Sequence, residues 1–148
     1  MKTKKAKKPN QLKKPSHKKL KKDAWDWFSK YIRLRDCLKT TGTKEWGTCI
    51  TCNTRHHFKE LQAGHFVSGR GNSVLFQEDG VHAQCMQCNF FKGGNPVAYM
   101  IKMIEMYGLP RTEAMQAEKR IIRSYRNEDL IEIACRYELA YKKLLGGI

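Results

Sequence analysis

The chain has 148 residues, which is enough for one domain with a modest hydrophobic core. Its formal net charge of +15 points to a polyanionic partner. No apolar run is long enough to cross a membrane, and no apolar segment follows the basic N-terminus as it would in a secretory signal. We therefore expect a cytoplasmic protein without a membrane partner.

The positive charge is concentrated at the N-terminus. Residues 1–22 contain eleven lysines and no acidic residue. The low-complexity composition of residues 1–19 predicts a disordered basic tail. A tail of this kind is typical of nucleic-acid-binding proteins, although a solvated extension that only aids solubility is the alternative. The tail residues expected to contact phosphates are Lys13, Lys14, Lys18 and Lys19.

A single domain is predicted over residues 20–148, with a core at 46–95 and C-terminal helices at 96–145. From about Leu20, apolar residues recur at three- and four-residue steps, which predicts an amphipathic helix. Its apolar face consists of Ala24, Trp27, Phe28, Tyr31, Leu34 and Leu38. The residues 40–43 (Thr-Thr-Gly-Thr) end the helix, and Cys37 is expected to be an ordinary core thiol.

Two C-x-x-C pairs follow this helix, separated by 32 residues. Four thiolates are a ligand set that suits a tetrahedral zinc ion, so Cys49, Cys52, Cys85 and Cys88 are predicted to hold one structural zinc. Neighbouring cysteines in such pairs usually bind a metal in a reducing compartment, which agrees with a cytoplasmic location.

Between the pairs, residues 61–67 and 81–84 are predicted strands. The first strand places His65 on one face with Ala63 and Val67. A glycine-rich loop at 68–73 carries one cation, Arg70.

After Cys88 the pattern is helical again, beginning at or near Asn89. Asn95 and Pro96 resemble an N-cap and a first helical residue. The expected apolar stripe of that helix is Val97, Met100, Ile101, Ile104 and Tyr107. A further helical segment, which carries Met115, Ile121 and Ile122, is expected at about 112–124. Asn127 is expected to begin a last helix, in which Cys135 is buried and inert.

A hairpin that carries a histidine, followed by a helix that opens with asparagine, is the outline of a ββα-metal nuclease site. Phosphodiester hydrolysis needs a base to activate water and a cation to hold the phosphate and leaving-group oxygens. A histidine with a pKa near neutrality suits the first role. Mg²⁺ or Mn²⁺ held by oxygen ligands, such as an asparagine carbonyl, suits the second.

The sequence resembles the NinG (Rap) recombination proteins of lambdoid phages. The resemblance rests on residues 63–66 (Ala-Gly-His-Phe), 81–89 and 93–96 (Gly-Gly-Asn-Pro), with residues 28–36 similar to that family's first helix. It implies a phage endonuclease that cuts branched DNA, such as Holliday junctions and D-loops, in the host cytoplasm. By the more distant analogy to HNH nucleases, His65 is the general base, Asn89 a ligand of the catalytic cation, and the four cysteines hold the structural zinc.

The chain departs from the HNH pattern at two positions. Gly64 stands where an acidic metal ligand is usual, and Gly80 stands where an asparagine orients the base. His82 could bind the cation or orient His65, or it could be a packed strand residue near the zinc. Glu78 or Asp79 could supply a carboxylate, and His65 could itself be the metal ligand. Lys92 and Arg70 are the expected phosphate contacts near the site.

These features predict an α+β protein: a small HNH-like ββα-metal core with a structural zinc, flanked by an N-terminal helix and a C-terminal helical cap. The expected partners are branched DNA and a second copy of the chain, because junction resolvases usually cut two strands symmetrically. Two alternatives remain. The protein could be a non-catalytic zinc accessory that binds DNA or RNA, or it could be a sequence-specific or nicking HNH endonuclease.

Overall fold

The first long helix, α1 (His17–Thr41), starts where a serine can cap it. The computed structural model describes residues 12–146, and in it the Ser16 side chain accepts a hydrogen bond from the Lys19 amide. The helix ends at Gly42, whose left-handed backbone (φ 72°) lets its N–H bond the Leu38 carbonyl. The helix thus begins three residues inside the segment 1–19 that was predicted to be disordered. Residues 1–11 of that segment lie outside the described residues.

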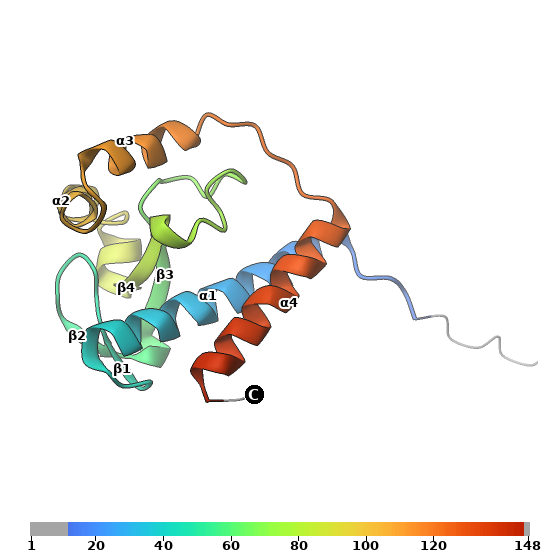
Figure 1. Ribbon diagram of the computed structural model, residues 1–148, viewed down its shortest axis with the longest axis horizontal. Coiled ribbons are helices and arrows are strands. Elements are labelled where there is room, and N and C mark those ends of the chain that lie inside the picture. The colour runs from blue at the N-terminus through green and yellow to red at the C-terminus, as the bar shows by residue number, and fades with distance from the viewer. Residues whose placement is uncertain (1–11, 147–148) are drawn as a thin grey trace, which may run out of the picture.

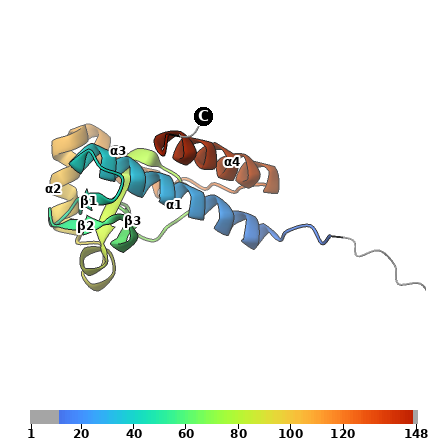
Figure 2. The same cartoon turned by 90° about the horizontal axis from the view of Figure 1, so that it is seen from below.

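The last helix, α4 (Asn127–Leu144), runs beside α1 along much of its length (Figures 1 and 2). Phe28 and Ile32 of α1 pack with Tyr137 of α4, and Leu20 and Ala24 pack with Leu130. Ile32 was not in the predicted stripe, and Leu38, which was, is only half-buried. Cys37 is fully buried, as predicted.

Two separate antiparallel hairpins lie between these helices in sequence. The first pairs β1 (Trp46–Thr48) with β2 (Arg55–His57), and the second pairs β3 (Leu61–His65) with β4 (Val81–Cys85). In the second hairpin, Gly64 lies opposite His82 and Ala63 opposite Ala83. β3 ends at His65 rather than at residue 67, because Phe66 and Val67 turn into a buried cluster with α2 and α3.

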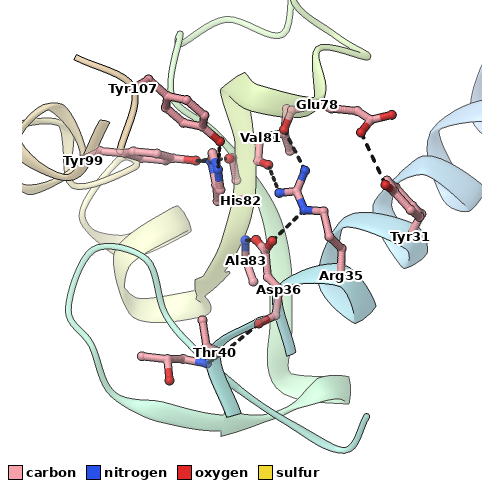
Figure 3. A network of polar contacts seen from close by, with 12 residues as sticks. Tyr31, Arg35, Asp36, Thr40, Glu78, Val81, His82, Ala83, Tyr99 and Tyr107 are labelled. Atoms are coloured by element: carbon pink, nitrogen blue, oxygen red, sulfur yellow. Dashed lines mark hydrogen bonds and ion pairs between the residues drawn. The ribbon is translucent and has the colours of Figure 1, made fainter. Parts of the chain in front are cut away.

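A network of polar contacts fastens α1 to β4 (Figure 3). The buried Asp36 carboxylate accepts hydrogen bonds from the Ala83 amide (2.7 Å) and from the Arg35 guanidinium (2.7 Å). Arg35 also donates to the carbonyls of Glu78 (2.8 Å) and Val81 (2.9 Å). A buried charge is tolerated only when it is paired in this way, so the helix is fixed in position against the strand.

The chain after β4 differs from the sequence-based prediction. A short π-helical turn (Gln87–Phe91) follows β4, and α2 (Pro96–Tyr107) starts after the Gly93-Gly94 break. Pro96 is at its start as predicted, but Tyr99 and Met103 form its buried face, while Val97, Ile101 and Ile104 are exposed. Apolar residues occur all round this helix, so periodicity alone could not select the packed face.

Two further expectations for the C-terminal region were wrong. The third helix, α3 (Leu109–Glu118), lies earlier than 112–124, and Ile121 and Ile122 are exposed in the segment that connects it to α4. Cys135 is exposed rather than buried, because α4 packs through the face that bears Leu130 and Tyr137. The mixture of helices and small sheets agrees with the predicted α+β class.

Among the described residues, no helix combines the length and the apolar character that crossing a bilayer requires.

Candidate functional site

The four predicted zinc ligands come together in the structure. The sulfur atoms of Cys49, Cys52, Cys85 and Cys88 all lie within 4.8 Å of one another. The sulfurs of Cys52 and Cys85 are 3.8 Å apart. Zn–S bonds of about 2.3 Å place the sulfurs of a tetrahedral site about 3.8 Å apart, so the cluster could bind a structural metal such as zinc.

The thiols of Cys49 and Cys85 in this cluster have strongly divergent pKa values. Burial is the largest influence on Cys49 and acts to raise its pKa, but hydrogen bonds from the Thr51 hydroxyl and from backbone amides outweigh it and lower the pKa to about 6. Burial and the neighbouring thiols raise the pKa of Cys85 to about 12. Four thiols in one small volume cannot all ionise without a cation among them, which is the chemistry of a metal-binding cluster.

His65 and Asn89 line the same cavity, of about 210 Å³, beside this cluster. Trp25 of α1, Arg70 and the glycines at 93 and 94 form other parts of its wall. His65 is the last residue of β3, and Asn89 is in the π-helical turn, so the hairpin and the turn bring the two residues together from distant positions in the chain.

The His65 ring is held in one orientation. Its Nε2 lies 3.1 Å from the Leu75 carbonyl oxygen, which can only accept a hydrogen bond, so Nε2 carries the proton and Nδ1 keeps its lone pair. The ring also stacks on Trp25, with centroids 5.1 Å apart. Burial, opposed by the Leu75 contact and assisted by Arg70, lowers the His65 pKa to about 4, below the near-neutral value expected from sequence. The imidazole is therefore neutral at pH 7, the form that can accept a proton.

The surroundings of Gly64 suit a hard cation. A Cβ atom on Gly64 would collide with Oε1 of Gln84 and would lie 3.0 Å from Oδ1 of Asn89. The Asn89 amide nitrogen donates to Gln62 (2.8 Å), which turns its oxygen toward this point. Oε1 of Gln84 is buried and has no hydrogen-bond partner among the residues that the structure describes. Amide oxygens are ligands that Mg²⁺ and Mn²⁺ accept, so this donor set fits the cation that the HNH resemblance implies.

His82 does not face this cavity. Its Nδ1 is 3.2 Å from the Tyr99 hydroxyl and its Nε2 is 3.0 Å from the Tyr107 hydroxyl (Figure 3). The Tyr99 hydroxyl donates in turn to the Gly64 carbonyl (2.8 Å). Both ring nitrogens of His82 are thus occupied, and burial lowers its pKa to about 4. These contacts favour the alternative in which His82 is a packed strand residue.

The two carboxylates that could have replaced an acidic residue at position 64 are engaged elsewhere. Glu78 accepts hydrogen bonds from Tyr137 (2.9 Å) and Tyr31 (3.4 Å). Asp79 pairs with Arg111 at 2.8 Å. The Leu75 carbonyl, and not a side chain at position 80, holds the orientation of the His65 ring.

The basic residues predicted to contact phosphates fall into two groups. Arg70 lies at the cavity, with its guanidinium 4.3 Å from the centre of the Trp25 ring. Lys92 is exposed just after the π-helical turn. Lys13 and Lys14 are exposed ahead of α1. The exposed Lys18 and Lys19 lie in its first turn, about 10 Å along the helix from Trp25, and Lys19 forms an ion pair with Asp23.

Sequence reasoning did not identify Trp25 or Gln84 as site residues. Trp25 lies off the helical stripe and gave no signal of a role, because its position at the cavity depends on how α1 crosses the hairpin. The sequence offered one hint for Gln84: it precedes Cys85 directly, in the strand that delivers the second cysteine pair.

Comparison with known proteins gives a consistent family. The family model described as the bacteriophage lambda NinG protein matches residues 1–145. The protein ninG of Salmonella phage P22 is 29% identical over 97 residues, which cover 65% of this chain and 47% of that protein. The protein ninG of Escherichia phage lambda is 30% identical over 70 residues, 47% of this chain and 34% of that protein. The chain spans about half the length of these relatives or less, and no solved structure is significantly similar to it.

Proposed function

The chain belongs to the family of the bacteriophage lambda NinG protein, and we propose that it is a divalent-metal-dependent endonuclease that cuts branched recombination intermediates, such as Holliday junctions and D-loops. The observation that carries this proposal is the shared cavity of His65 and Asn89, placed beside a four-cysteine cluster. The HNH resemblance led us to expect these two residues at one site, although Asn89 lies in a π-helical turn and not at the start of α2.

In this proposal His65 is the general base. Its Nδ1 lone pair is available because Nε2 is committed to Leu75, and the neutral ring can take a proton from a water molecule in the cavity. Asn89 and Gly64 define the place of the divalent cation. When bound, that cation would stabilise the charge that develops on the phosphate and leaving-group oxygens.

The surface around the cavity suits DNA. Arg70 at the cavity and the exposed Lys92 supply positive charge for phosphates. Phe90 and Phe91, which follow Asn89 directly, are 72% and 65% exposed. Exposed aromatic rings can stack with bases that are not paired, and such bases are available at branch points rather than within a duplex.

The proposed zinc has a structural role. Cys49 and Cys52 connect the first hairpin to β4 and to the turn that carries Asn89, through Cys85 and Cys88. A metal in this position would hold the base and the asparagine in fixed relation, and small domains often need such a metal to stay folded.

The test compares cleavage of a four-way junction with cleavage of linear duplexes that have the same arm sequences. The parent protein is expected to cut the junction only with Mg²⁺ or Mn²⁺. His65→Ala and Asn89→Ala are each expected to bind the junction nearly as well as the parent and to cut it at least ~100-fold more slowly. His57→Ala, at a half-buried histidine of β2 that does not line the cavity, is the matched control and should cut normally. Normal cutting by His65→Ala would refute the mechanism.

A non-catalytic accessory protein is the second candidate. No carboxylate lines the cavity among the residues that the structure describes, and HNH enzymes usually have one. If the parent binds junctions but cuts none with any divalent cation, the accessory function is correct. If it cuts linear duplex as fast as a junction, the sequence-specific or nicking alternative is favoured. The homodimer remains a prediction, which sedimentation on a junction can test.

A further inference from the structure

One buried side chain beside the proposed cation, that of Gln84, has an atom without a hydrogen-bond partner among the described residues. Its side chain is fully buried in β4, yet its Oε1 has no hydrogen-bond partner in the structure. An amide oxygen buried without a partner is costly, on the order of 1–3 kcal/mol, so a residue of this kind at a candidate site has a function to explain.

The orientation of the Gln84 amide is fixed by its neighbours. Its Nε2 donates to the Gly94 carbonyl (2.9 Å) and to the Thr51 hydroxyl (3.2 Å). A carbonyl can only accept, so the nitrogen must face Gly94, and exchanging the amide nitrogen and oxygen would remove this bond. The oxygen is therefore directed at Gly64.

Gln84 and Asn89 converge on one point from two elements. Oε1 of Gln84 occupies the space of a Cβ on Gly64, and Oδ1 of Asn89 lies 3.0 Å from the same position. In the HNH pattern, residue 64 would carry the acidic metal ligand. In this chain Gly64 has no side chain to occupy that position, and the amide oxygen of Gln84, from the neighbouring strand, occupies it.

We propose that Gln84 provides an oxygen ligand to the divalent cation, in the place that a carboxylate on residue 64 would otherwise take. This inference rests on the proposed function. It also explains why Gly64 has no side chain, since any Cβ would displace the Gln84 oxygen. Both amide ligands are uncharged, so the site binds its cation weakly by itself, and DNA phosphates would strengthen that binding.

The same side chain connects the cation site to the cysteine cluster. The Thr51 hydroxyl that accepts from Gln84 lies 3.3 Å from the sulfur of Cys49. Two hydrogen bonds thus fix the Gln84 amide nitrogen, one to Thr51 within the first cysteine pair and one to Gly94 before α2. The proposed zinc therefore positions an oxygen of the cation site.

Gln77 offers a matched control within the chain. It too is a glutamine with a buried Oε1 that has no partner, and that oxygen faces a glycine, Gly80. Gln77 lines a different cavity, beside α4 and the segment that precedes it, and its amide donates to Glu118.

The first experiment uses the unaltered, zinc-loaded chain without DNA. Substoichiometric Mn²⁺ is added, and the side-chain amide signals are followed by ¹⁵N NMR. Broadening falls steeply with distance from Mn²⁺, so the strongest broadening is expected for Gln84 and Asn89, to similar extents, with Gln77 broadened much less. If Gln84 broadens far less than Asn89, the Gln84 oxygen is not a ligand and the inference is overturned.

The second experiment measures Mn²⁺ affinity by electron paramagnetic resonance of the free ion, with zinc content determined in each sample. Gln84→Ala should weaken binding at least ~10-fold, since altering even the residues that only support metal ligands costs that much. Gln77→Ala should not change it. Adding Gly64→Asp to Gln84→Ala should restore Mn²⁺ binding, because the aspartate enters the space that Gln84 has left.

The outcomes separate this inference from the function on which it rests. Unchanged Mn²⁺ affinity in Gln84→Ala, or no recovery with Gly64→Asp, would overturn the role of Gln84 while junction cutting by the parent continued to support the endonuclease. If Gln84→Ala loses its zinc or its fold, the NMR result on the unaltered chain decides. A parent that shows Mn²⁺ broadening at both amides but never cuts DNA would keep the cation site and reject the nuclease.

Discussion

His65 and His82 lie at neighbouring positions of the same hairpin but have opposite surroundings. His65 keeps one nitrogen free at a cavity, whereas His82 bonds two tyrosine hydroxyls with both nitrogens. The pKa of each is lowered to about 4, chiefly by burial, so acidity does not distinguish them. Their hydrogen-bond partners do, because they leave one nitrogen of His65 available for the chemistry proposed above and engage both nitrogens of His82.

We predict that His82→Ala lowers stability without removing the chemistry. The substitution removes the His82 contact from the hydroxyls of Tyr99, which keeps its bond to the Gly64 carbonyl, and Tyr107, and it opens a cavity. This should cost about 3 kcal/mol of unfolding free energy. Urea denaturation measures this loss. Junction cutting by the folded variant, below its melting temperature, should stay within a few-fold of the parent, with zinc content unchanged. A loss of cutting of ~100-fold with normal stability would place His82 in the site.

The helix α1 has several roles, because different faces of it meet different parts of the molecule. One face packs against α4, Trp25 forms part of the cavity wall, and Asp36 is bonded to β4. The position of the cavity therefore depends on how firmly the helix is attached to the strand.

Removal of the Asp36 carboxylate should loosen this attachment. Asp36→Ala leaves the Ala83 amide without an acceptor and removes the carboxylate that neutralises Arg35, whose guanidinium keeps only the Glu78 and Val81 carbonyls. Breaking a buried pair of this kind typically costs about 3 kcal/mol or more. Asp26→Ala, which removes an exposed ion pair with Lys22 from the same helix, is the control and should leave the urea midpoint unchanged. Equal midpoints for the two variants would show that the buried contact contributes little.

The cysteine cluster joins the first hairpin to β4 and the following turn, so we predict that its metal is required for folding. Elemental analysis should find about one zinc per chain. Cys85→Ser should lose the zinc and much of the folded structure, since structural zinc sites contribute on the order of 10 kcal/mol of folding free energy. Cys135→Ser, at an exposed thiol of α4, should keep both. Circular dichroism of the metal-stripped variant provides the readout, and full folding there would contradict the prediction.

Over the whole molecule, positive charge lies both at the cavity and at the N-terminal end of α1. Deleting residues 1–14 removes seven lysines and retains the Ser16 cap of α1. Each lost phosphate contact should reduce the slope of log affinity against log salt by about 0.9, while the preference for junctions over duplex should remain. Binding titrations at several salt concentrations test this. A variant with Lys142 and Lys143 changed to Gln is the charge control. If the deletion leaves the salt slope unchanged but removes the preference for junctions, the tail selects the DNA structure and does not supply the affinity.

The sequence by itself determined the cysteine cluster, the hairpin that carries His65 and the helices at both ends. Fixed spacings of chemically distinctive residues produce these signals, and so does the periodicity of a helix that is polar on one side, such as α1. In α2 the prediction of the buried face was wrong, because apolar residues surround that helix and only its neighbours select Tyr99 and Met103. Cys135 was mispredicted because α4 packs through the face that bears Leu130 and Tyr137, and α3 ends at Glu118, before the exposed Ile121 and Ile122.

Only the tertiary structure decided which groups meet at the site. The approach of Trp25 to His65, the occupation of both His82 nitrogens and the direction of the Gln84 oxygen toward Gly64 all depend on contacts between residues far apart in the chain. Local propensity carries no information about such contacts, since they are set by how α1, the second hairpin and α2 pack together. For that reason the sequence indicated only that Gly64 lacks the side chain of a metal ligand. The fold shows that the Gln84 oxygen occupies the space that a side chain on Gly64 would need.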